Sequence, residues 1–165
     1  MTHPVEFSIY TDGGYFEKQD LGGWGSVIYQ QGQELLRQSD WQKHTSSLEM
    51  ELKAAVKGLE SLQSYLQTEQ LPLSPPAQFQ ITLFTDSRIL IEGLSEKITH
   101  WRLNNWIHKS GNRVKYQTLW EMLESLTQQL QVKWQWVKGH NGNLGNTIAD
   151  QLARKAVMQR LQETY

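Results

Sequence analysis

The order of the predicted elements constrains the fold of this 165-residue chain more than any other feature. Alternating apolar and polar residues and glycine-containing turns predict three strands in succession, over residues 5–10, 24–30 and 34–41. A 3.6-residue apolar period then predicts a long helix over residues 45–67. Strands and helices alternate beyond it, with strands over 79–85 and 132–137 and helices over 86–94, 98–109, 116–130 and 144–162. This order predicts an α/β fold, in which an antiparallel meander joins a mixed sheet with helices on its faces.

The composition limits the class of protein. With 38% hydrophobic residues over this length, the chain can bury one core, so we expect a single domain over residues 1–165. It holds no cysteine, which excludes disulfides and a thiol nucleophile and suits the cytoplasm. No apolar run reaches the length of a membrane span, and acidic residues near the start argue against a secretory signal. We expect a free-standing cytoplasmic protein with no membrane partner.

The charge is unevenly distributed, although the net charge is only -1. Residues 97–115 hold five basic side chains and no acidic one. Trp101 and Trp106 lie among these basic residues. Basic residues interleaved with aromatic ones suit a phosphate backbone with bases or sugars to stack against. The alternative is a solvated basic surface over two core tryptophans.

Two aspartates follow predicted strands. Asp12 lies in a predicted turn over residues 11–14, and Asp86 follows the strand at 79–85. If these strands are parallel neighbours, both carboxylates reach the end of the sheet where open α/β sheets bind ligands. The alternatives are a turn aspartate at position 12 and a helix N-cap at position 86.

Two more carboxylates lie on predicted helices. Glu51 is on or beside the apolar stripe of its helix, where a carboxylate is paired, protonated or metal-bound unless it reaches water at the stripe's edge. Asp150 stands four residues before Arg154, and the apolar period predicts that it is exposed. Carboxylates without cysteine or paired histidine suit Mg²⁺ or Mn²⁺. Two such ions about 4 Å apart can activate water and stabilise a leaving alkoxide in phosphodiester hydrolysis.

Six motifs, in their order and spacing, make the sequence resemble type 1 ribonuclease H over nearly its whole length. They are Thr11-Asp12-Gly13, Gly22-Gly23-Trp24-Gly25, Met50-Glu51-Leu52, Thr85-Asp86-Ser87, Trp136-Val137-Lys138-Gly139-His140, and Asn146 with Asp150. The resemblance implies a ribonuclease H-like fold with five strands, the fourth and fifth parallel to the first. It implies an endonuclease that hydrolyses the RNA strand of RNA–DNA hybrids with two Mg²⁺ ions, or Mn²⁺ in their place, leaving 5′-phosphate and 3′-hydroxyl ends. We expect it to act as a monomer.

The resemblance also implies roles for individual residues. It makes metal ligands of the four carboxylates, Asp12, Glu51, Asp86 and Asp150, so that Asp150 is a ligand rather than a surface residue. It gives His140 a part in proton transfer or product departure. Residues 97–115 correspond to the basic handle of the family, and we keep that name for them. The substrate-binding positions implied are Gly13, Ser47, Trp101, Arg102, Trp106, Lys109, Arg113, Lys115 and Asn146.

One departure from the family concerns the start of the long helix. Ser47, Leu48 and Glu49 stand where the family usually has amide side chains and an arginine, so we expect weaker hybrid binding than in relatives. Two alternatives remain: a non-catalytic or weakly active nucleic-acid-binding domain of the same fold, and a nuclease or strand-transfer enzyme acting on DNA. All four acids and His140 argue against the first. The loop around His140 and the basic handle argue against the second.

Overall fold

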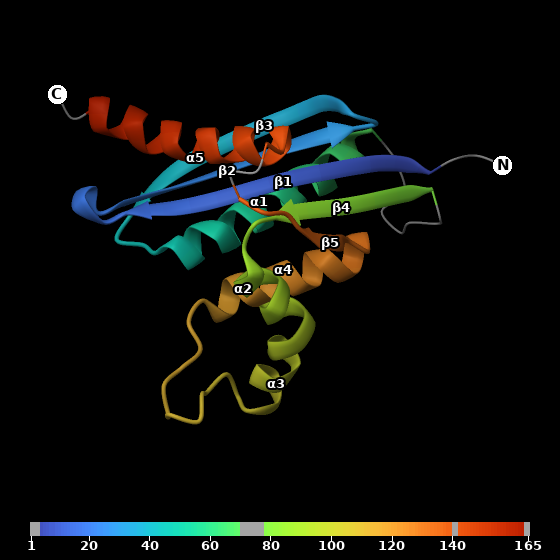
Figure 1. The fold of residues 1–165 in the computed structure, drawn as a ribbon. Helices are drawn as coiled ribbons and strands as arrows, with labels where there is room; N and C mark the ends of the chain where they lie inside the picture. Colours follow the sequence, from blue (N-terminus) through green and yellow to red (C-terminus); the bar gives the residue numbers. More distant parts are fainter. Residues whose placement is uncertain (1–3, 70–77, 140–141, 164–165) are drawn as a thin grey trace.

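The computed structural model describes residues 4–69, 78–139 and 142–163. It contains a five-stranded mixed sheet in the order β3-β2-β1-β4-β5 (Figure 1). The strands are β1 (Val5–Phe16), β2 (Leu21–Gln30), β3 (Gln33–Lys43), β4 (Phe79–Thr85) and β5 (Lys133–Trp136). β1 pairs antiparallel with β2 and β2 with β3, whereas β4 runs parallel to β1 and β5 parallel to β4. The predicted α/β fold with an antiparallel meander in a mixed sheet is confirmed.

Helices cover both faces of the sheet. The long ones are α1 (Ser47–Thr68), α4 (Gln117–Leu130) and α5 (Leu144–Gln162); the short ones are η1 (Glu17–Gln19), α2 (Arg88–Glu92), the π-helical turn η2 (Gly93–Lys97) and α3 (Ile98–Leu103). Gly13 packs on the backbone of α1, while Gly23 packs on the backbone of α5. Gly13 pairs with Trp24, the neighbour of Gly23, so these two glycines point to opposite faces. α1 and α5 therefore lie on opposite sides of the sheet, as Figure 1 shows.

The main core lies between the sheet and α1 with α4. The apolar stripe of α1 is buried as its period predicts, at Leu52, Ala55, Val56, Leu59, Leu62 and Leu66. Strand residues Phe7, Ile9 and Leu83 and helix residues Trp120 and Leu123 complete the same cluster. This layer packs α1 against β1 and β2, and that contact positions the site described below. No helix in the described ranges is both long and apolar enough to cross a membrane.

The predicted turn over residues 11–14 is wrong, because β1 continues through it to Phe16. Gly13 and Gly14 pair with Trp24 and Gly23 of β2 instead of turning. A Cβ at Gly13 would lie 2.4 Å from the carbonyl carbon of Met50. The glycine at position 13 thus allows close approach of α1, and the chain does not bend there.

The handle and β4 also depart from prediction. The helix predicted over 98–109 ends at Leu103, because Asn105 and Trp106 adopt left-handed conformations with φ of 54° and 60°. The helix predicted over 86–94 begins at Arg88, and Ser87 caps it in place of Asp86. β4 was expected to be buried on both faces, but Phe84 is only half-buried and Gln80 is exposed.

A paired glycine comparison tests how closely α5 lies on the sheet. We expect Gly23→Ala to lower the free energy of unfolding by about 3 kcal/mol, since overpacking forces backbone shifts. The added Cβ would lie 2.1 Å from the carbonyl oxygen of Ala153. Its partner in the ladder, Gly14, has no atom within 4 Å of an added Cβ, so Gly14→Ala serves as the control. Urea denaturation of both variants measures the difference; equal midpoints would contradict this packing.

Candidate active site

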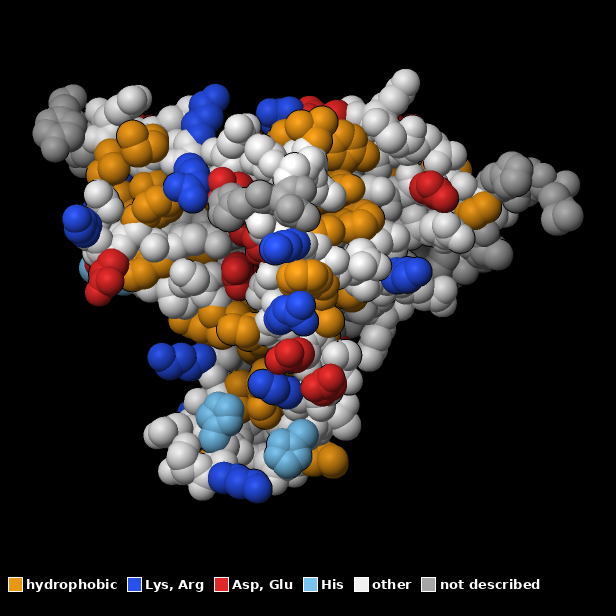
Figure 2. Space-filling view, in the orientation of Figure 1, with side chains coloured by type: hydrophobic (Ala, Val, Ile, Leu, Met, Phe, Trp, Pro, Cys, Tyr) orange, Lys and Arg blue, Asp and Glu red, His pale blue; other side chains and the backbone are white. Residues whose placement is uncertain are grey.

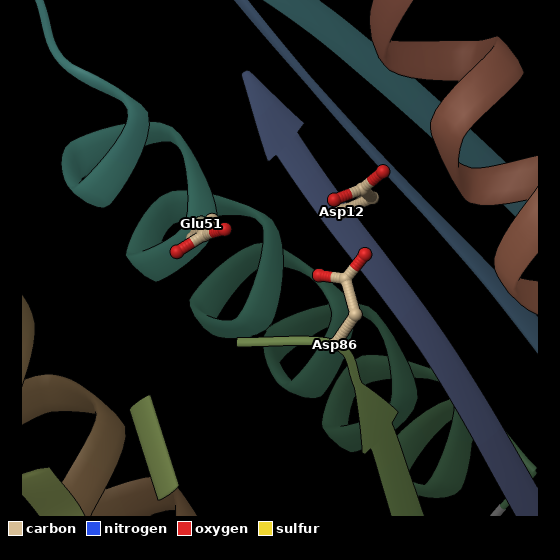
Figure 3. A group of neighbouring side chains, drawn as sticks. All are labelled: Asp12, Glu51 and Asp86. Atoms are coloured by element: carbon tan, nitrogen blue, oxygen red, sulfur yellow. The ribbon is translucent and has the colours of Figure 1, made fainter. Parts of the chain in front are cut away.

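The parallel pairing of β1 with β4 brings two aspartates together. The last paired residues are Tyr10 and Phe84, and Asp12 and Asp86 each follow two positions later. Because the two strands run in the same direction, both carboxylates reach the same end of the sheet. Figure 3 shows them with Glu51 of α1, all three pointing into one space. Carboxylate oxygens of Asp12, Glu51 and Asp86 all lie within 4.8 Å of one another.

Local structure at the start of α1 delivers Glu51 to this space. The Ser46 side chain caps the helix by accepting a hydrogen bond from the Glu49 backbone N–H at 3.1 Å. A Cβ at Gly13 would lie 2.5 Å from the backbone nitrogen of Glu51, so only glycine lets the helix come this close. The cap fixes where α1 begins, and the close contact sets the depth at which Glu51 lies.

Two of these carboxylates, Asp12 and Glu51, resist ionisation. Burial raises the pKa of Asp12 to about 8, with further contributions from the charge of Asp86 and a hydrogen bond with Asp150. Burial also raises the pKa of Glu51 to about 7; a hydrogen bond from Ser87 opposes this shift, while the charge of Asp86 adds to it. A set of half-buried carboxylates with mutual repulsion and oxygen donors only is the chemistry that Mg²⁺ or Mn²⁺ neutralises. These residues therefore fit a hard divalent cation.

Asp150 lines the same hollow from α5. We call this space of about 250 Å³ the carboxylate hollow; its lining residues are Asp12, Gly13, Gly14, Phe16, Glu51, Asp86, Asp150, Ala153 and Arg154. The Asp150 side chain is only 23% exposed, and its Oδ2 accepts a hydrogen bond from Arg154 Nε at 3.0 Å. The exposure predicted from the apolar period is wrong, because α5 lies on the sheet beside β1. The i, i+4 ion pair with Arg154 predicted from the spacing is present.

Gly139, the last residue of the described range 78–139, lies against a site carboxylate. A Cβ there would lie 2.9 Å from Oδ2 of Asp86. Asn143 caps α5 by accepting a hydrogen bond from the Asn146 backbone N–H at 3.0 Å. Asn146 is 4% exposed, and its buried Oδ1 has no hydrogen-bond partner among the described residues. His140 lies outside the described residues.

The sequence left open whether the handle binds nucleic acid or is a solvated basic surface over two core tryptophans, and the structure shows features of both. Trp106 is 7% exposed and packs against Trp101, so it builds the handle from inside, as the core alternative expects. Arg102 forms an ion pair with Glu124 of α4, which ties the handle to the body. The other four basic positions of the handle, Lys97, Lys109, Arg113 and Lys115, are exposed. Figure 2 shows basic and histidine side chains on this projecting part of the molecule.

A second hollow lies between the handle and the start of α1. Its volume is about 620 Å³, and its lining residues are Leu48, Ile89, Lys97, Trp101, His108, Asn112, Arg113, Val114, Lys115 and Trp120. Of the residues predicted to bind substrate, it brings together Trp101, Arg113 and Lys115. Leu48 was singled out from the sequence as a departure from the family, whereas Ile89, which is 56% exposed, was missed. Ser47 is exposed, and Glu49 accepts a hydrogen bond from Thr45 Oγ1 at 2.6 Å.

Known proteins resemble this chain in sequence and in fold. A family model described as RNase H matches residues 4–158. Ribonuclease H of Francisella philomiragia is 37% identical over 150 residues, which cover 91% of this chain and 90% of that protein. The protein of the same name from Francisella tularensis subsp. novicida has the same identity and coverage.

Solved structures share the fold. The N-terminal RNase H domain of a Mycobacterium tuberculosis protein superimposes with a TM-score of 0.71 at 18% identity, over 98% of this chain and 99% of that one. LC11-RNase H1 in complex with an RNA/DNA hybrid superimposes with a TM-score of 0.66 at 21% identity, over 94% and 99% of the two chains.

Proposed function

Because the chain belongs to the ribonuclease H family, we propose that its carboxylate hollow hydrolyses the RNA strand of RNA–DNA hybrids. The observation that carries this proposal is the convergence of Asp12, Glu51 and Asp86 from three separate elements, with their oxygens within 4.8 Å of one another. Such a cluster is costly for the fold and suits a site for divalent cations. Asp150 lines the same hollow and supplies a fourth carboxylate.

Asp12, Glu51, Asp86 and Asp150 would hold two Mg²⁺ ions, or Mn²⁺, in the presence of substrate. When bound, these ions activate the attacking water and stabilise the leaving 3′-alkoxide, which leaves 5′-phosphate and 3′-hydroxyl ends. The unpartnered Oδ1 of Asn146 is available to accept a hydrogen bond from the scissile region or the attacking water. His140 assists proton transfer or product departure, a role supported by its place between Gly139 and the cap of α5 in the sequence.

The handle holds the polyanion while the acidic residues do the chemistry. Exposed Lys109, Arg113 and Lys115 supply positive charge away from the carboxylate hollow, and half-buried Trp101 offers a surface for sugar or base contact. Gly13 lines the carboxylate hollow, and Ser47 is the first residue of α1. Both lie in reach of the strand being cut. Arg102 and Trp106 contribute by fixing the handle through Glu124 and Trp101.

We propose that residues 1–165 act as one domain, as a monomer and in the cytoplasm. All four carboxylates of the hollow come from one chain, so the site needs no second copy. The absence of cysteine from the sequence suits a reducing compartment.

A substrate panel tests the function. Labelled RNA–DNA hybrid, duplex RNA and duplex DNA are each incubated with Mg²⁺, Mn²⁺ or EDTA. We expect cleavage of the RNA strand of the hybrid with either metal and no cleavage in EDTA. Equal cleavage of duplex DNA, or cleavage of the hybrid in EDTA, would contradict the proposal.

A triple substitution tests the role of the handle. Lys109→Ala, Arg113→Ala and Lys115→Ala together should raise KM about tenfold or more at low salt and leave kcat within about twofold. Loss of phosphate contacts also reduces the salt dependence of binding, by about 0.9 in the log–log slope for each contact. Lys133→Ala, an exposed cation at the far end of β5, is the control. A large loss of kcat at saturating hybrid would show that the handle acts in the chemical step.

A further inference from the structure

One arginine, two positions after the site carboxylate Asp86, lies over an aromatic ring. The Cζ atom of Arg88, the first residue of α2, lies 4.1 Å from the centroid of the Trp136 ring. Trp136 in turn donates a hydrogen bond from Nε1 to the backbone carbonyl oxygen of Asp86 at 3.2 Å. The indole is therefore fixed to the strand end that carries a site carboxylate, and the guanidinium is fixed to the indole.

Arg88 differs from most arginines of the described residues in its partners. Arg37, Arg102 and Arg154 each form an ion pair with a carboxylate, and the ion pairs found in the described ranges include none with Arg88. Its side chain is exposed to solvent. Because the guanidinium lies over the ring and is exposed, its N–H groups can still reach a ligand, and their planar fork matches two oxygens of a phosphate. The stacking also lowers the entropy that an exposed arginine loses on binding.

The position of Arg88 relative to Asp86 identifies its ligand. Arg88 is two positions after Asp86, so their Cα atoms lie at most about 7 Å apart. A phosphodiester held at the carboxylates therefore brings its neighbour on the same strand within reach of the guanidinium. The cations of the handle contact phosphates on another part of the surface, across the second hollow. Arg88 contacts a phosphate next to the one that is cut.

We propose that Arg88, stacked on Trp136, binds a backbone phosphate of the RNA strand adjacent to the phosphate that is cut. This inference rests on the proposed function, since it takes the strand at the carboxylates to be RNA. Arg88 is a binding residue here and takes no part in the proton transfers. Its charge also offsets part of the repulsion between the acidic residues and the incoming strand.

Binding measured without cleavage tests the proposal. Affinity for a labelled hybrid is determined in EDTA between 50 and 200 mM salt for the parent, Arg88→Gln, Arg88→Lys and Arg160→Gln. Arg160 is a matched control, because its Cζ lies 4.5 Å from the ring centroid of Trp41. It lies ten residues beyond Asp150 on α5, about 15 Å along the helix.

We expect Arg88→Gln to weaken binding about fivefold at 50 mM salt and to lower the log–log salt slope by about 0.9, the value for one lost phosphate contact. Arg88→Lys should keep the slope and lose part of the affinity, because a point charge lacks the planar fork. Arg160→Gln should match the parent. In the Mg²⁺ assay, Arg88→Gln should raise KM and leave kcat within about twofold.

An uncharged methylphosphonate linkage, placed in the RNA or in the DNA strand, shows which strand Arg88 contacts. Replacing the RNA phosphate next to the cut position by a methylphosphonate should weaken binding by the parent and leave Arg88→Gln unaffected. The same change in the DNA strand should weaken both proteins equally. An unchanged salt slope in Arg88→Gln, or a loss that follows the DNA linkage, would overturn the proposal. These binding results do not depend on catalysis, so a parent that binds but fails to cleave would refute the proposed function alone.

Discussion

Replacing Asp86 by asparagine should reduce kcat for RNA-strand cleavage on the order of 10³-fold or more, while the fold remains intact. Asp86 shares one space with Asp12 and Glu51, and its charge contributes to the raised pKa values of both. A neutral amide of the same size cannot hold divalent cations as a carboxylate does. The loss should therefore appear in kcat and in the Mg²⁺ concentration needed for half-maximal activity.

The control for Asp86→Asn removes a carboxylate outside the site, so that the effect of losing any one negative charge can be subtracted. Glu121→Gln removes a carboxylate from the exposed side of α4 and should keep full activity. Circular dichroism and thermal melting should show that Asp86→Asn is folded. Near-normal turnover by folded Asp86→Asn would exclude the carboxylate hollow as the catalytic site.

Replacing Asp12 by asparagine should make the metal-free protein more stable at pH 8, by about 2 kcal/mol or more. Burial raises the pKa of Asp12 from 3.8 to about 8 in the folded protein. Between these two values the unfolded chain is ionised while the folded protein keeps the proton. Folding therefore takes up a proton, and the free energy of unfolding falls as the pH rises through this window. Asparagine carries no charge and removes that loss.

The pH dependence is the sharper part of this expectation. Below about pH 4 the aspartate is protonated in both states, so parent and Asp12→Asn should have similar stabilities. Their difference should grow from pH 4 to pH 8 and level off above it. Added Mg²⁺ should stabilise the parent at pH 8 and leave the variant nearly unchanged. Urea denaturation in EDTA and in Mg²⁺ measures both effects; a variant less stable than the parent at pH 8 in EDTA would contradict the raised pKa.

Local patterns predicted the helix that carries Glu51 and the strand that precedes Asp86. The 3.6-residue period of α1 places Glu51 beside a stripe that the structure buries, and the capping serine at position 46 marks where the helix begins. The predicted bounds of the strand before Asp86 agree with those of β4. Both features depend on residues close together in the chain, where spacing and capping chemistry determine the structure.

Contacts between distant segments explain what the patterns missed. Gly13 looks like a turn residue, and only the approach of α1, nearly forty positions later, shows that it is a packing glycine. The burial of Asp150 depends on where α5 crosses the sheet, and the apolar period of the α5 sequence does not determine that position. The handle helix stops early because Trp106 turns inward onto Trp101. The stacking of Arg88 on Trp136 joins two elements whose separation in the chain hides it.

Metal rescue of a sulfur-substituted substrate tests most directly whether the carboxylate hollow acts through divalent ions at the scissile phosphate. A hybrid carries one phosphorothioate at the cleaved RNA linkage, and its two diastereomers are separated. Sulfur binds Mg²⁺ poorly and softer ions better. For at least one diastereomer, the rate in Mg²⁺ should fall at least about tenfold and recover in Mn²⁺, and Asp86→Asn should show no recovery. Equal effects of sulfur in Mg²⁺ and Mn²⁺ for both diastereomers would contradict metal-ion catalysis at this site.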